Sequence, residues 1–294
     1  MSPLFNRRQR YAIFKSWYVL RLVRWYSVLS VMIAQYLSAL FLLNTGKSKI
    51  DLIIDPQLHI SIFATAFIIA SGFIINSFYD LERDTINRPD RVIFSRMVSQ
   101  TTCLNMYFFF NTVGVVMSFY VDKGVMLFNL LFSRALWFYS HKLKKKAFLG
   151  ELSAALLNIA PFFVVVIFYR TCTFDIFLYL SFIGLIIIIR EIIKDVLSEK
   201  GDLIFGYETL PIKVGMKATK QTIALLMLMT VIPFAVLFKL HGFTLVMGYF
   251  FLGELVVIVS LVLLKNASSS SQFERLNTIY KLLTIAGVLS IPLV

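Results

Sequence analysis

Long apolar stretches recur along the whole chain, and they limit its fold more than any other feature. Each is about twenty residues long, the length at which a helix crosses the hydrocarbon core of a bilayer. Hydrophobic residues make up 59% of the 294 residues and charged residues only 15%, which leaves no room for a sizeable soluble domain. The runs also lack the alternation of barrel strands. The sequence therefore predicts an all-α, polytopic membrane protein.

The apolar stretches predict about nine transmembrane helices in one domain that covers residues 1–294. The basic segment before the first span, residues 1–24, is rich in Tyr and Trp, and we expect it to lie along the cytoplasmic leaflet as an amphipathic helix. The predicted spans are residues 26–44, 58–80, 97–120, 123–140, 147–169, 174–191, 219–239, 243–264 and 276–294.

The Lys and Arg residues predict the orientation of the chain. Most of them precede the first span or fall in every second loop after it, and such loops are cytoplasmic. We therefore expect the N-terminus to lie in the cytoplasm. We also expect the protein to belong to the bacterial inner membrane and to contact its lipids. The formal charge of +13 is mostly topological, so it does not predict a nucleic-acid partner. The sequence gives no sign of a protein partner either.

A run of acidic and basic residues begins where the second span is predicted to end. The segment FIINSFYDLERDTINRPDR, residues 73–91, places Asn76, Asp80 and Asp84 at steps of four. Each such step advances a helix by about 40°, so the three side chains project along one face over about two turns. We refer to these three residues as the first ladder.

A second ladder follows the sixth span and consists of Asp195, Glu199 and Asp202. These residues also lie nearly in line on a helix. Several carboxylates at one membrane surface repel one another unless a cation lies between them. Oxygen ligands without Cys or His suit Mg²⁺ or Ca²⁺, and Mg²⁺ usually completes its coordination shell with waters and substrate phosphates. Two sparse sets of oxygen ligands that face each other, Asn76 included, resemble a clamp in which Mg²⁺ holds a diphosphate, and this is the site we expect.

Basic residues lie at the same predicted membrane depth as the ladders. They could bind the phosphate oxygens that metal ions leave free, Arg through two parallel hydrogen bonds and Lys as a point charge. Membrane topology alone also places Lys and Arg there, so the two interpretations are balanced for each residue. Besides Asn76, the candidate diphosphate-binding residues are Arg88, Arg91, Lys142, Lys144, Arg190 and Lys194.

Four short motifs occur in one order along the chain. The first ladder runs into an NRPDR turn at residues 87–91, and YSHKLK follows at residues 139–144. The second ladder is introduced by REIIKD at residues 190–195, and TLP follows at residues 209–211. Together these motifs resemble the UbiA family of membrane prenyltransferases, and four of them in order make a specific signal. The REIIKD motif is most similar to the branch of digeranylgeranylglyceryl phosphate synthases.

The resemblance implies Mg²⁺-dependent transfer of a polyprenyl group, with geranylgeranyl as one candidate, from its diphosphate to a lipophilic acceptor. Geranylgeranylglyceryl phosphate is one candidate acceptor, and an aromatic ring is the alternative. Asp80, Asp84, Asp195 and Asp202 would assist ionisation of the diphosphate, and the ring of Tyr139 would stabilise the allylic cation. The active site would lie at the cytoplasmic side of the helices, which would surround a central apolar cavity.

Three positions depart from that branch. Ser77 and Ser198 stand where Asp is expected, and Glu151 stands where Asn is frequent. Loss of an acid from the second ladder could weaken one metal site, with Glu199 as a substitute. It could instead indicate a different acceptor or reduced activity.

Charged residues also lie deeper in the predicted spans, and we do not count them as catalytic. An ion pair between Arg134 and Glu151 that secures helix packing is as plausible as a role in acceptor binding. Glu254 interrupts another apolar run.

Two other classes of protein share some of these features. A transporter also has many spans and buried charges, but transporters concentrate charge near the membrane midplane, whereas these acids lie near one surface. A CDP-alcohol phosphatidyltransferase also binds metal through aspartates at the membrane boundary, but its acids form one continuous run. Two ladders far apart in the sequence favour the prenyltransferase.

Overall fold

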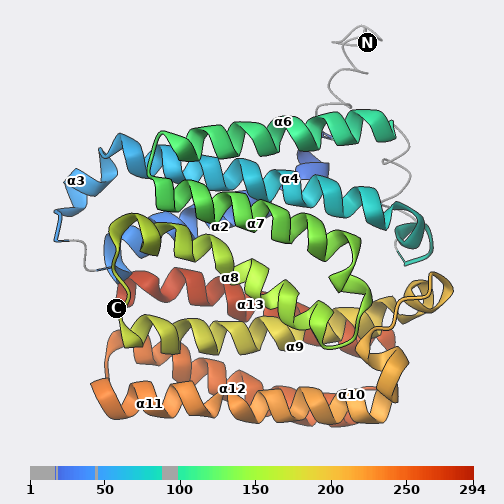
Figure 1. Ribbon diagram of the computed structural model, residues 1–294. Coiled ribbons are helices and arrows are strands. Elements are labelled where there is room, and N and C mark those ends of the chain that lie inside the picture. The colour runs from blue at the N-terminus through green and yellow to red at the C-terminus, as the bar shows by residue number, and fades with distance from the viewer. Residues whose placement is uncertain (1–16, 18, 44–45, 88–98) are drawn as a thin grey trace, which may run out of the picture.

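The computed structural model describes residues 17, 19–43, 46–87 and 99–294. Within this part of the chain the regular structure is helical, so the predicted all-α fold is confirmed (Figure 1). The long helices are α2 (Trp25–Leu37), α4 (Pro56–Asn87), α6 (Gln100–Phe119), α7 (Lys123–His141), α8 (Leu149–Tyr169), α9 (Phe174–Ile204), α10 (Leu210–Met229), α11 (Val231–His241), α12 (Leu245–Asn266) and α13 (Ser270–Ser290). Shorter elements are a π-helix (Ser38–Leu42), α3 (Lys49–Ile53) and two 3₁₀ turns (Leu143–Lys145 and Ile291–Leu293).

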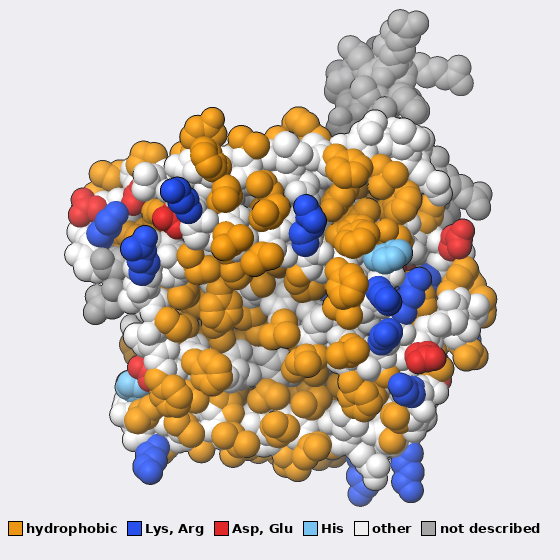
Figure 2. Space-filling model, in the orientation of Figure 1, with side chains coloured by type: hydrophobic (Ala, Val, Ile, Leu, Met, Phe, Trp, Pro, Cys, Tyr) orange, Lys and Arg blue, Asp and Glu red, His pale blue; other side chains and the backbone are white. Residues whose placement is uncertain are grey.

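Eight helical segments in the described part of the chain are long and apolar enough to cross a membrane. Helix α7 has 19 residues but is not among them, because Lys123, Asn129 and Arg134 make it more polar. The predicted count of about nine spans is therefore not confirmed. Figure 2 shows the surface that results, with hydrophobic side chains over most of the face and charged ones mainly toward its two ends. The chain is an integral membrane protein.

The two helices that carry the ladders extend well beyond the predicted membrane spans, as the helical arrangement of the ladders requires. Helix α4 continues to Asn87, although the second span was predicted to end at residue 80, and α9 continues to Ile204 rather than ending at residue 191. Apolar sequence marks where lipid contact ends, whereas a helix continues as long as its backbone and packing allow. Both ladders therefore lie within regular helix.

Helices α4 and α9 are also the most buried spans. In the apolar window of each span, 72% of the α4 residues and 61% of the α9 residues are buried, against 11% in α6. Helix α9 contacts α4, α8, α10, α11 and α13, and its Phe182 lies in the largest core cluster. The acids of the two ladders are thus carried by the most buried helices of the bundle.

The ends of α4, α7 and α9 and the starts of α8 and α10 gather at one end of the bundle, at the right in Figure 1. We call this the ladder end. The opposite end carries the connection between α8 and α9 and the chain's C-terminus. The expected amphipathic helix at residues 1–24 lies largely outside the described residues. The predicted central apolar cavity, the single domain and the cytoplasmic location of the ladder end stay predictions.

The ion pair between Arg134 and Glu151 that one interpretation of the sequence predicted does not form. Arg134 is exposed on α7, while Glu151 on α8 is buried, and no ion pair joins these two described residues. One Glu151 carboxylate oxygen instead accepts a hydrogen bond from the backbone N–H of Leu210 at 3.3 Å. Glu151 therefore connects α8 to the start of α10.

Candidate active site

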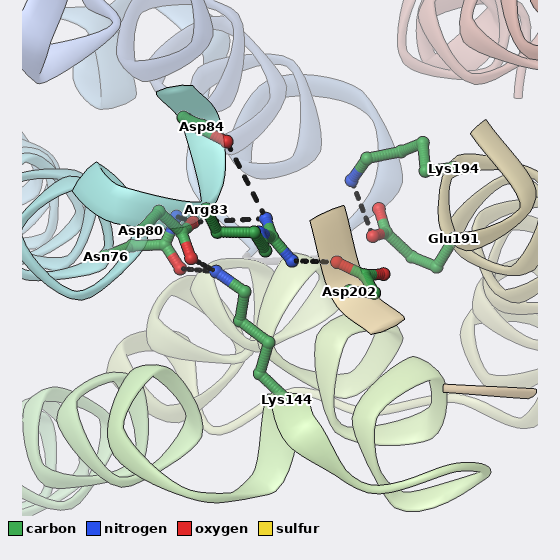
Figure 3. Close-up of polar contacts among 8 residues, drawn as sticks. All are labelled: Asn76, Asp80, Arg83, Asp84, Lys144, Glu191, Lys194 and Asp202. Carbon is green, nitrogen blue, oxygen red and sulfur yellow. Dashed lines mark hydrogen bonds and ion pairs between the residues drawn. The ribbon is translucent and has the colours of Figure 1, made fainter. Parts of the chain in front are cut away.

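The first ladder forms a compact polar cluster at the ladder end (Figure 3). The amide nitrogen of Asn76 donates to Asp80 Oδ2 at 3.0 Å, as the four-residue spacing predicted. Lys144 donates to Asn76 Oδ1 at 3.1 Å and forms an ion pair with Asp80 Oδ1. Asp80 is buried, and both of its carboxylate oxygens have partners: Lys144 contacts Oδ1, and the Asn76 amide donates to Oδ2.

Arg83 joins the two ladders. Its NH2 lies 3.4 Å from Asp80 Oδ2 and 4.0 Å from Asp84 Oδ1, and its NH1 lies 3.2 Å from Asp202 Oδ1 (Figure 3). The guanidinium also lies over the ring of Tyr207, 5.2 Å from the ring centroid. Carboxylates from α4 and α9 thus meet at one cation.

Sequence reasoning missed Arg83 as a site residue. It was counted only as one of the basic residues that set the topology. The available signal was its position three residues after Asp80, which places an Arg beside that acid on the surface of the same helix. Its contact with Asp202 depends on how α4 packs against α9, and no local pattern reveals that packing.

The Lys144 loop owes its shape to close backbone packing. Helix α7 ends at His141, the chain makes a 3₁₀ turn, and Phe148 adopts a left-handed φ of 64° before α8 begins. A Cβ atom on Gly150 would lie 3.2 Å from the carbonyl oxygen of Lys144. Glycine therefore lets α8 approach the loop and aim Lys144 at the first ladder.

Backbone contacts join this loop to the other motifs. The N–H of Glu208 donates to the carbonyl of Lys145 at 2.9 Å, and Lys146 forms a parallel bridge with Glu208. On the other side, the N–H of Gly201 donates to Asn87 Oδ1 at 2.9 Å. All four sequence motifs are therefore represented at the ladder end.

Burial shifts the pKa of two side chains outside the spans, those of Lys144 and Tyr207. Burial lowers the pKa of the Lys144 ammonium group to about 8, although the Asp80 carboxylate opposes this shift. Burial also raises the pKa of the Tyr207 phenol to about 12, with a further contribution from Asp80. At neutral pH Lys144 is therefore a cation, and Tyr207 is a neutral ring beneath Arg83.

A second group of polar residues lies on α9, beside the cluster that Asp80, Arg83 and Asp202 form. Glu191 is buried and forms an ion pair with Lys194 at 2.6 Å (Figure 3). Asp195 lies within electrostatic range of Glu191 and Asp202, and Tyr139 lies within range of Glu191, Asp195 and Asp80. Tyr139 and Asp195 thus border the cluster that Asp80 and Asp202 form.

The other predicted site residues are placed differently. Lys142 is exposed, and its side chain makes no ion pair or hydrogen bond with the described residues of the cluster. Arg190 donates to Asn277 of α13 at 3.2 Å, and Glu199 is partly exposed without a described partner in the cluster. Arg88 and Arg91 lie outside the described residues. Lys142 does not reach the cluster because it follows His141, the last residue of α7, where its side chain is exposed.

The described side chains of the site fit a hard divalent cation only with help from a substrate. No three Asp, Glu, His or Cys residues in the described part converge closely enough to hold a metal ion by themselves. The donors present are carboxylate and amide oxygens, which suit Mg²⁺. Asp202 is fully buried, and its Oδ2 has no hydrogen-bond partner in the part of the chain that the structure describes. Such an oxygen fits an ion whose remaining ligands come from phosphates and water.

Comparison with known proteins decides the family. Residues 21–282 match the UbiA prenyltransferase family. The chain belongs to this family. Its UbiA relatives include a digeranylgeranylglyceryl phosphate synthase from Sulfurisphaera tokodaii, 28% identical over 244 residues (79% of this chain and 84% of the relative), and one from Methanosarcina mazei, 30% identical over 241 residues (77% and 81%).

Solved structures show the same UbiA fold. A structure described as digeranylgeranylglyceryl phosphate synthase aligns with a TM-score of 0.69 at 21% identity and covers 95% of this chain and 97% of its own. A UbiA homologue from Archaeoglobus fulgidus bound to GPP and Mg²⁺ aligns with a TM-score of 0.66 at 16% identity and covers 94% and 100%. As a UbiA prenyltransferase, the chain is an enzyme, and the transporter and phosphatidyltransferase interpretations are not supported.

Proposed function

We propose that this UbiA enzyme transfers a geranylgeranyl group from its diphosphate to the free hydroxyl of an anionic glycerol phosphate ether lipid, with Mg²⁺ as cofactor. Geranylgeranylglyceryl phosphate is the acceptor that the names of its relatives favour. Mg²⁺ is supported by the oxygen donors of the two ladders and by the Mg²⁺ that a homologue of the same fold binds together with GPP. The transfer would take place at the ladder end.

One observation carries this proposal: Asp80 on α4 and Asp202 on α9 contact the same guanidinium group. Carboxylates that meet at one cation are close enough to act on one charged substrate group. The apolar spans lead directly to this point, because both ladders continue helices that are buried within the bundle. A diphosphate can therefore bind at the polar end while its prenyl chain stays among apolar side chains.

The reaction breaks the bond between C1 of the prenyl chain and the diphosphate oxygen and leaves positive charge on the allylic carbons. The acceptor hydroxyl oxygen then forms the bond to C1 and loses its proton to water, and inorganic diphosphate is released. Bound Mg²⁺ would neutralise charge on the departing diphosphate. Lys144 would bind a diphosphate oxygen as a point charge, and the ring of Tyr139 would stabilise the allylic cation.

The ladders supply the proposed ligands. Asp195 and Asp202 would hold the metal from α9, and Asp84, with an exposed side-chain fraction of 26%, is open to solvent on the α4 side. Asn76 orients Asp80 through their hydrogen bond. Lys194 would approach the diphosphate only by leaving Glu191. We also propose that the ladder end faces the cytoplasm, since the Lys and Arg residues concentrate in the loops at that end.

A direct assay tests the function. The purified chain in lipid nanodiscs is incubated with radiolabelled geranylgeranyl diphosphate, Mg²⁺ and either geranylgeranylglyceryl phosphate, 4-hydroxybenzoate or no acceptor. We expect a labelled ether lipid in the first case alone, and no product when EDTA replaces Mg²⁺. A labelled ring product would instead support an aromatic acceptor. Absence of any prenyl transfer with either acceptor would contradict the proposal.

Two variants of the same helix provide the matched comparison. Asp202→Asn removes the charge of the buried carboxylate at the ladder end of α9, and transfer should fall by at least 100-fold. Asp175→Asn changes an exposed carboxylate at the other end of α9, where Asp175 contacts His241. Transfer by this control should stay within about twofold of the unchanged enzyme, since surface ion pairs contribute about 0 to 1 kcal/mol.

A further inference from the structure

Arg83 is the one residue in the described part whose side chain forms ion pairs with carboxylates of both α4 and α9. Lys144 pairs with the first ladder alone, and Lys194 pairs with Glu191 of its own helix. The position between Asp80 and Asp202 is the one that a bridging metal ion would take. In this chain it holds a guanidinium group.

We propose that Arg83 permanently replaces one bridging metal ion, so that the site binds one Mg²⁺ per diphosphate and binds it on the α9 side. This inference rests on the proposed function, because it assumes a diphosphate substrate. It gives Arg83 a role at the diphosphate itself. It also makes the two helices unequal: α4 is neutralised by side chains, and α9 supplies the metal ligands.

The free lone pairs of the two buried carboxylates differ. Asp80 Oδ1 accepts from Lys144, and Asp80 Oδ2 faces both Asn76 and Arg83. A carboxylate offers about four lone pairs, so three donors leave Asp80 little capacity for a metal ion. Asp202 uses Oδ1 for Arg83, while Oδ2 is buried and has no partner among the described residues. The open coordination position is therefore on α9.

Several contacts keep Arg83 in place. Its side chain is only 14% exposed, and its guanidinium lies between three carboxylates and the ring of Tyr207. Arg stays protonated at every accessible pH, so it cannot lose its charge when a metal ion arrives. A divalent ion between Asp80 and Asp202 would have to displace this buried cation into a less favourable environment.

Arg83 also retains a donor for an anion. Its Nε is buried and has no partner among the described residues. A guanidinium that uses NH1 and NH2 for carboxylates can still donate from Nε to a phosphate oxygen. The charge of the leaving diphosphate would then be met by one Mg²⁺, Arg83 and Lys144 together.

Metal stoichiometry tests the inference without measuring turnover. The chain in nanodiscs is saturated with geranylgeranyl S-thiolodiphosphate, an unreactive substrate analogue, and titrated with Mn²⁺ as a spectroscopic substitute for Mg²⁺. Electron paramagnetic resonance then counts the bound ions, after subtraction of those that the analogue binds without protein. We expect one ion per chain. Arg83→Met, which vacates the bridging position, should bind two.

Matched variants keep the result interpretable. Lys200→Met removes one positive charge from an exposed position beside Gly201 and Asp202, and it should keep the count at one. Arg83→Lys keeps the cation and should also stay at one. Two ions in the unchanged enzyme would overturn the inference whether or not the variants fold, and so would a count of one in folded Arg83→Met. Failure of the unchanged enzyme to bind the analogue at all would instead contradict the proposed function.

Discussion

Gly201 of α9 lies directly against Asn87 of α4: its backbone N–H donates to Asn87 Oδ1 at 2.9 Å, and no side chain separates the two. The contact fixes the spacing of the ladder helices one residue away from Asp202. A Cβ atom on Gly201 would overlap the Asn87 side chain. The spacing of the two ladders therefore depends on a glycine that is not itself a ladder residue.

Gly201→Ala should separate the ladders. The added methyl group must push Asn87 and the end of α4 away, which would lengthen the distance between Arg83 and Asp202. We expect transfer activity to fall by at least tenfold, since small displacements of catalytic groups have large effects on rate. Steady-state transfer of radiolabelled prenyl groups measures the change.

Gly248→Ala is the control for that variant. Gly248 also lies in a helix, α12, but a Cβ atom there would meet no atom within 4 Å. Alanine favours helix over glycine by about 1 kcal/mol, so this variant should be at least as stable as the unchanged enzyme and fully active. Equal activity of the two variants would contradict a role for the Asn87 contact.

Lys144 and Lys142 are two residues apart and should respond differently to substitution. Lys144→Met removes the cation that contacts Asn76 and Asp80, and it should weaken binding of geranylgeranyl S-thiolodiphosphate by at least tenfold. Lys142→Met changes an exposed side chain and should alter binding by less than twofold. Equilibrium binding of the analogue in nanodiscs distinguishes them, and similar losses in both variants would mean that Lys142 reaches the diphosphate.

Glu151 should act through the start of α10. Glu151→Leu removes the acceptor for the Leu210 N–H and leaves that buried donor unsatisfied, which costs about 1 to 3 kcal/mol. We expect a lower melting temperature together with reduced activity. Glu151→Gln keeps an acceptor oxygen at the same place and should restore most of the stability. If Glu151→Gln melts as low as Glu151→Leu, the hydrogen bond is not what Glu151 provides.

The helices and the alignment of side chains within the first ladder could be predicted from the sequence, because both follow from local periodicity. Apolar runs of span length located the helices, and four-residue spacing aligned Asn76 with Asp80, whose hydrogen bond confirms that alignment. The predicted spans end before α4 and α9 do, because apolar composition reports lipid contact rather than the end of a helix. Lys144 contacts Asn76 and Asp80, but this contact does not decide between phosphate binding and membrane topology, so its role at the diphosphate stays a prediction.

Contacts between distant segments were beyond the reach of sequence reasoning. Arg83 was counted as one more basic residue near a membrane surface, and nothing local indicates that it meets Asp202 of another helix. Lys142 and Lys144 have the same charge and lie in one motif, yet the loop turns only Lys144 toward Asp80. The role of Gly201 likewise appears only when α4 and α9 are seen in contact.

The central claim is that carboxylates of both ladders act on one diphosphate. Crystals of the chain with geranylgeranyl S-thiolodiphosphate and Mn²⁺ test it most directly, because anomalous scattering locates the metal. The account predicts Mn²⁺ bound to Asp202, with the diphosphate between α4 and α9 and in contact with Lys144. A diphosphate bound away from either helix, or Mn²⁺ bound without Asp202, would contradict it.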